Sequence, residues 1–63
     1  MNNLEIMVKI LENISNCNVE IFINKKRLWS VIITNLDNNG FGDGINKKLE
    51  LAIKEAIENY ERK

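Results

Sequence analysis

The sequence lacks proline and histidine, has a single cysteine, and confines its three glycines to residues 40–44. The lone cysteine, Cys17, cannot form a disulfide within the chain. Without histidine, the commonest zinc ligand and the usual base of nucleophilic catalysis are both missing. Cys17 is flanked by Asn16 and Asn18, whereas a reactive thiolate needs a neighbouring cation or metal. We therefore predict that the chain is not an enzyme and binds no metal or other cofactor.

An excess of charge of either sign is also absent, because nine basic and nine acidic residues cancel. A neutral chain has no overall field that would hold it on nucleic acid or on an anionic membrane. Charged residues interrupt every long apolar window, and no basic segment precedes an apolar one at the N-terminus. These features predict a cytoplasmic protein without a signal peptide or membrane span.

The 63 residues form a single predicted domain, 1–63. A chain of this size buries only about 60% of the surface that it exposes when unfolded. Small domains gain further stability from disulfides, metals or oligomerisation. Oligomerisation is the aid left open here, so we expect a homodimer.

Residues 3–15 have the spacing of an amphipathic helix. The apolar positions, which form an unusually wide arc, are Leu4, Ile6, Met7, Val8, Ile10, Leu11 and Ile14. An arc this wide has two interpretations. Either the helix packs on both a sheet and a second helix, or it also contacts a subunit or another protein.

Alternating β-branched and apolar residues predict two strands over 19–23 and 28–36, joined by a polar hairpin turn. A three-residue loop, 25–27, would pair Asn24 with Leu28. The residues that would then share an apolar core face are Val19, Ile21, Ile23, Trp29, Val31 and Ile33. We prefer this register because a two-residue loop would mix polar and apolar residues on one face.

The other face of this hairpin is not properly polar, because Phe22, Leu28 and Ile32 lie on it. Such a patch is either covered by another element or contacts a partner. Two strands are also too few for an independently stable sheet. We therefore assign Phe22, Leu28 and Ile32 to a partner-binding surface, and we expect sheet edges to pair between subunits or with another protein.

The glycine segment 40–44 is expected to be a turn in which the glycines take positive φ. It leads into a final helix that ends near Glu61 and is capped by Asn46 or Asp43. The apolar stripe of that helix consists of Ile45, Leu49, Ala52, Ile53, Ala56, Ile57 and Tyr60. The predicted fold class is α+β, in the order α-β-β-α, with both helices on one face of an antiparallel hairpin.

The glycine segment contains the beginnings of two ligand sites without their required residues. Asp37, Asn39 and Gly42 have the spacing that starts a calcium loop, yet Lys48 stands where a bidentate glutamate is needed. A glycine-rich loop before a helix can also hold a phosphate, but the known phosphate-loop and dinucleotide spacings are absent. We therefore expect a hinge and no ligand site here.

Gly42-x-Gly44 followed by Lys47-Lys48 resembles the end of double-stranded-RNA-binding domains, where a strand and a Gly-x-Gly turn precede a Lys-Lys pair at the start of the final helix. The resemblance implies that Lys47 and Lys48 contact phosphates across the RNA major groove. The third strand of that family has no counterpart among the predicted elements. Nucleic-acid binding is therefore an alternative function, and it would use Lys25, Lys26, Arg27, Lys47 and Lys48.

A tryptophan-containing strand, a glycine turn and a helix with spaced alanines are formed here by Trp29, Gly44, Ala52 and Ala56. In these features the chain also resembles antitoxins of the HicB type and many small phage-borne proteins. This resemblance implies an RNA-binding-like fold that often acts by binding a protein. The small size, the composition typical of an AT-rich genome and the absent catalytic residues are similar to phage-encoded inhibitors of bacterial defence nucleases, including anti-CRISPR proteins. The expected function is a small protein-binding module that inhibits a nuclease complex or a toxin.

Overall fold

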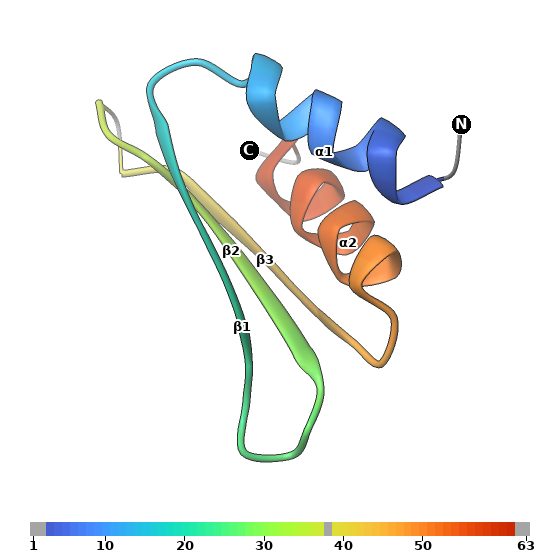
Figure 1. The fold of residues 1–63 in the computed structure, drawn as a ribbon. Coiled ribbons are helices and arrows are strands. Elements are labelled where there is room, and N and C mark those ends of the chain that lie inside the picture. The colour runs from blue at the N-terminus through green and yellow to red at the C-terminus, as the bar shows by residue number, and fades with distance from the viewer. Residues whose placement is uncertain (1–2, 38, 62–63) are drawn as a thin grey trace.

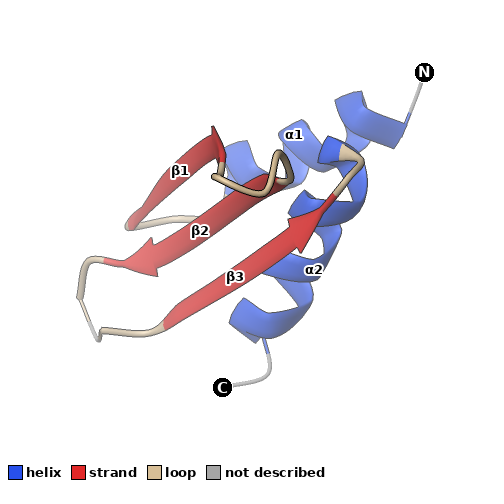
Figure 2. Cartoon of the chain, turned by 90° about the horizontal axis from the view of Figure 1, so that it is seen from below, coloured by secondary structure: helices blue, strands red, loops and turns tan. Residues whose placement is uncertain are grey.

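A computed structural model of the protein describes residues 3–37 and 39–61. The elements, in chain order, are α1 (Asn3–Asn13), β1 (Cys17–Ile23), β2 (Trp29–Asn35), β3 (Phe41–Asn46) and α2 (Leu49–Glu61). The strands form one antiparallel sheet in the order β1-β2-β3. Both helices lie on the same side of this sheet (Figures 1 and 2). The α+β class with two helices on one face is confirmed, and the sheet has a third strand.

The β1–β2 hairpin has the predicted register. Ile21 pairs with Val31 and Ile23 with Trp29, while the Asn24 amide donates a 2.9 Å hydrogen bond to the Leu28 carbonyl oxygen. Side chains on successive residues of a strand point to opposite faces, so this register separates the apolar helix side from the outer side.

Residues 41–44 of the glycine segment belong to β3, so the predicted glycine turn is wrong. Gly42 pairs with Ile33 and Gly44 with Val31, and none of the glycines has a positive φ. Both glycines face α2, and a Cβ atom on Gly44 would lie 2.6 Å from the Ala56 backbone nitrogen. Glycine is needed here because the helix backbone packs directly on the strand, where no side chain fits.

The stripe predicted for the last helix is correct except at its start. Leu49 and Tyr60 pack against the core from α2. The buried core consists of Val31, Ile33, Ala52, Ile53, Ala56 and Ile57. Ile45 instead belongs to β3, on the outer face, and is 48% exposed. Asn46 ends β3, and its side-chain oxygen accepts a 3.1 Å hydrogen bond from the Lys48 amide just before α2.

Helix α1 uses only part of its wide apolar arc. Met7, Leu11 and Ile14 pack against the core, but no residue of the helix is buried. Four further apolar residues of α1 are exposed, namely Leu4, Ile6, Val8 and Ile10. The arc therefore exceeds what contact with the rest of this chain requires.

We expect Gly44→Ala to lower the free energy of unfolding by about 1–3 kcal/mol or more, because the added methyl group would force α2 away from β3. Asp43→Ala is the matched control, because it removes a side chain on the exposed face of the same strand. Urea denaturation measures both variants. Equal stabilities for the two would contradict direct packing of α2 on the glycines.

Candidate protein-binding surface

The hairpin turn between β1 and β2 is held by one side chain, that of Asn24. Its Oδ1 atom accepts hydrogen bonds from the amides of Lys26 (2.8 Å) and Leu28 (3.2 Å). Its Nδ2 atom donates to the Ser30 hydroxyl oxygen at 3.0 Å. Arg27 takes a φ of 65°, a left-handed conformation that closes the turn. Asparagine at position 24 thus presents three basic side chains at the tip of the hairpin.

On the outer face of the sheet, two apolar residues of the edge strands flank a buried serine of β2. Ser30 of β2 pairs with Phe22 of β1 on one side and with Ile45 of β3 on the other. Phe22 is 44% and Ile45 48% exposed, while Ser30 between them is only 5% exposed. The helices lie on the opposite side of the sheet (Figure 1). We call Phe22, Ile45 and the nearby half-buried Leu28 the outer-face patch.

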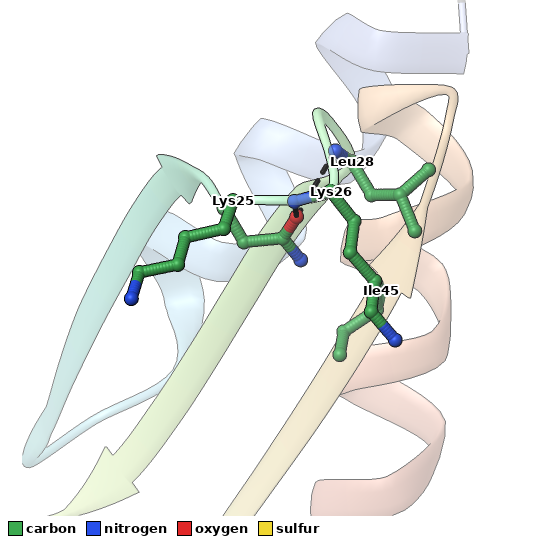
Figure 3. Close-up of a pocket in the computed structure, with 5 residues that line it drawn as sticks. Lys25, Lys26, Leu28 and Ile45 are labelled. Atoms are coloured by element: carbon green, nitrogen blue, oxygen red, sulfur yellow. Dashed lines mark hydrogen bonds between the residues drawn. The ribbon is translucent and has the colours of Figure 1, made fainter.

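A shallow hollow of about 410 Å³ lies at the hairpin end of the outer-face patch. Its lining residues are Asn24, Lys25, Lys26, Leu28 and Ile45. Figure 3 shows that the Lys26 side chain runs along Ile45, whereas Lys25 points away from it. The hollow therefore joins an apolar floor to a basic rim.

Ile32 lies on the same face but outside the outer-face patch. It is half-buried, and its neighbours across the sheet are Glu20 on β1 and Asp43 on β3. Of the three apolar residues that we assigned to a partner-binding surface, Leu28 lines the hollow, and Phe22 lies on the same face, opposite Ser30. Ile32 lies between two acidic residues.

Ile45 is the residue of this surface that sequence analysis missed, because it was assigned to the core-facing stripe of a helix. The signal was an alternation with a period of two: Phe41, Asp43 and Ile45 are separated by single glycines, as side chains on one face of a strand would be. We interpreted the glycines as turn residues, and this concealed the alternation.

The five basic residues predicted to bind a partner gather at one end of the sheet. Lys25, Lys26 and Arg27 form the hairpin turn that precedes Trp29, the first residue of β2. Trp29 pairs with Asn46, the last residue of β3, and Lys47 and Lys48 follow it directly. All five of these side chains belong to exposed residues. The protein is neutral overall, but its basic residues are concentrated at this end.

Within residues 3–37 and 39–61, no group of three or more histidine, cysteine or acidic residues is placed to hold a metal ion. No helix in the same ranges is long and apolar enough to cross a membrane. Comparison with protein-family models, with curated proteins and with solved structures found no match. The proposed function therefore rests on the outer-face patch and the basic residues beside it.

Replacing the side chain of Asn24 tests how the hairpin tip is held. We expect Asn24→Ala to lower the free energy of unfolding by about 1–2 kcal/mol and to speed amide exchange at Lys26 and Leu28, because both amides lose their acceptor. Asn18→Ala changes an exposed asparagine of β1 and serves as the control. Unchanged exchange at Lys26 in Asn24→Ala would contradict this role.

Proposed function

We propose that the chain is a non-enzymatic protein-binding module and that the outer-face patch is its binding surface. The observation that carries this proposal is the exposure of Phe22 (44%) and Ile45 (48%) on either side of Ser30, on the same face of the sheet. No helix in the described ranges covers this face of the sheet (Figure 2). Exposed apolar groups that cluster on one face are typical of interaction sites.

The outer-face patch has the parts from which binding energy usually comes. A phenylalanine provides a large apolar area, and burying one such side chain contributes about 1.5–3 kcal/mol. The hollow beside Leu28 and Ile45 offers a place for one apolar side chain of a partner. A few central residues of this kind usually dominate the affinity of an interface.

The rim of the hollow selects the chemistry of the partner. Lys25 and Lys26 line it, and Arg27 lies next to them in the turn. Basic residues around an apolar centre speed association with an acidic surface and reject a basic one. The partner that fits is therefore a protein segment with an apolar side chain flanked by aspartate or glutamate.

We further propose that this binding serves inhibition, with a bacterial defence nuclease complex or a toxin as the target and a phage as the source. The support is the resemblance of the small, histidine-free chain to such inhibitors, together with an amino-acid composition typical of an AT-rich genome. An inhibitor needs no catalytic group, because occupation of a surface on the target is enough.

We expect Phe22→Ser with Ile45→Ser to weaken binding to the target protein at least about tenfold, because an apolar contact worth several kcal/mol is lost. The matched control is Leu36→Ser with Leu51→Ser, two residues that are 68% and 40% exposed elsewhere on the surface. A target first captured by the tagged protein from host extract is purified and titrated against all three forms.

A target that binds the outer-face variant and the control equally would contradict the proposal. Lys25→Ala with Lys26→Ala tests the charge argument separately. We expect slower association and a weaker dependence on salt for that variant, because the basic rim is removed.

Nucleic-acid binding is the second candidate, and the gathering of five basic residues at one end of the sheet favours it. Strand β3 also provides a third strand, which the resembled RNA-binding family has. Lys47 and Lys48 lie between this strand and α2, as the resemblance requires. Phosphate contacts from these lysines would supply most of the affinity.

If this second function is correct, duplex RNA binds the protein at low salt and binds more weakly as salt rises. Lys47→Ala with Lys48→Ala should then reduce the slope of log affinity against log salt by about 2, about one for each lost contact. Lys9→Ala with Lys54→Ala removes equal charge from the two helices and is the control. No binding to duplex RNA or DNA in a fluorescence titration would exclude this function.

A further inference from the structure

We propose that β1 pairs with β1 of a second copy of this chain, in antiparallel orientation about a two-fold axis at Ile21. The pairing would join two three-stranded sheets into one continuous sheet. It uses the backbone edge of β1, next to which Phe22 of the outer-face patch lies, and it does not rest on the function proposed above.

The two edges of the sheet differ in how their backbone groups are satisfied. On the β3 edge, the Ile45 amide donates to the Glu55 carboxylate at 3.3 Å. The Asp43 carbonyl oxygen accepts a 2.6 Å hydrogen bond from the Asn59 side chain. Two side chains of α2 thus cover this edge. The described part of the chain supplies no strand beyond β1.

The free edge of β1 presents donors and acceptors at every second residue. The Asn24 amide bonds to Leu28, and the Leu36 amide bonds to the Asn16 carbonyl, so the even-numbered residues around β1 direct their backbone groups towards β2. In an antiparallel ladder the intervening residues direct theirs outward. Val19, Ile21 and Ile23 therefore offer their N–H and C=O groups to another strand.

Val19 packs against the core, but the side chains of the other two residues lack cover. Ile21 and Ile23 belong to the helix side of the sheet, yet they are 43% and 50% exposed, while Val31, the partner of Ile21, is 0% exposed. Figure 1 shows why, since the hairpin half of β1 extends beyond both helices. Long apolar edge strands are usually blunted by charge or proline, and β1 has neither on this side.

Self-complementarity identifies a second copy as the occupant and selects the register. With Ile21 opposite Ile21 of the second copy, Val19 lies opposite Ile23 of that copy, and all outward-directed groups from 19 to 23 are paired. On the outer face, Glu20 then lies opposite Phe22 of the second copy. A shift to an axis at Glu20 would place two glutamates directly opposite each other, which is unfavourable.

Sedimentation equilibrium tests the pairing. We expect the wild-type protein to form a species of twice the 7.3 kDa chain mass at micromolar concentration. Ile21→Pro should weaken association about tenfold or more, because the Ile21 amide points away from β2 and each dimer loses two hydrogen bonds. Ile21→Lys, which places a charge on the edge, should act in the same direction if the proline variant fails to fold.

Leu51→Lys is the matched control, since Leu51 is 40% exposed and lies at the start of α2. It should leave association unchanged. Amide exchange separates this dimer from others, because the Ile21 amide is protected only when β1 is paired with a second copy. A monomer at all concentrations, or a dimer in which this amide exchanges freely, would overturn the proposal.

Disulfide cross-linking tests the register. In a Cys17→Ser background, Ile21→Cys should form a covalent dimer under mild oxidation, because opposed residues in a ladder lie within disulfide reach. Glu20→Cys should not, and preferential cross-linking of Glu20→Cys would overturn the register. If the dimer forms while the Phe22→Ser, Ile45→Ser variant still binds its target, the pairing stands and the proposed binding surface fails.

Discussion

The close contact between α2 and the glycines of β3 determines the shape of this small domain. Gly42 and Gly44 let the helix backbone approach the strand so closely that a Cβ atom would lie 2.6 Å from backbone atoms of α2. The alanines of the helix, Ala52 and Ala56, face this contact and are fully buried. Because α2 lies so near β3, its polar side chains Glu55 and Asn59 also reach the outer edge of that strand.

The same contact leaves the opposite edge of the sheet exposed. With α2 over β3 and β2, and α1 packed beside it, cover on the helix side reaches Val31 and Ile33 but not Ile21 or Ile23. Within residues 3–37 and 39–61, no further element covers them. The apolar surface that remains on β1 is therefore a consequence of where the helices sit, and a second copy would remove it from water.

The two proposed surfaces occupy different parts of the same sheet. In the proposed dimer, both copies of the outer-face patch would lie on one face of a six-stranded sheet, with their basic hairpin turns directed to opposite sides of the axis. Two linked sites on one assembly raise apparent affinity for a target that presents two copies of its own site. If the proposed inhibition is correct, such an arrangement would strengthen it, because inhibition by binding depends on occupancy of the target.

The sequence by itself determined the features that rest on local periodicity and turn chemistry. The hairpin register followed from the alternation of apolar residues around Asn24, because a one-residue slip would have exchanged the two faces. The apolar stripe from Leu49 to Tyr60 followed from helical spacing. The basic turn and the apolar residues Phe22 and Leu28 followed from the same register. These features depend on neighbours within a few residues of one another.

Only the tertiary structure decided the role of the glycines, the place of Ile45 and the difference between the two sheet edges. A glycine in sequence is equally compatible with a positive φ and with the close approach of a distant helix, and Tyr60 lies far along the chain from Gly42. Interpreting 40–44 as a turn moved Ile45 from the strand to the helix and thus from the outer surface to the core. Long-range packing of α2 on β3 settled all three points, because no local pattern records which backbone a helix will contact.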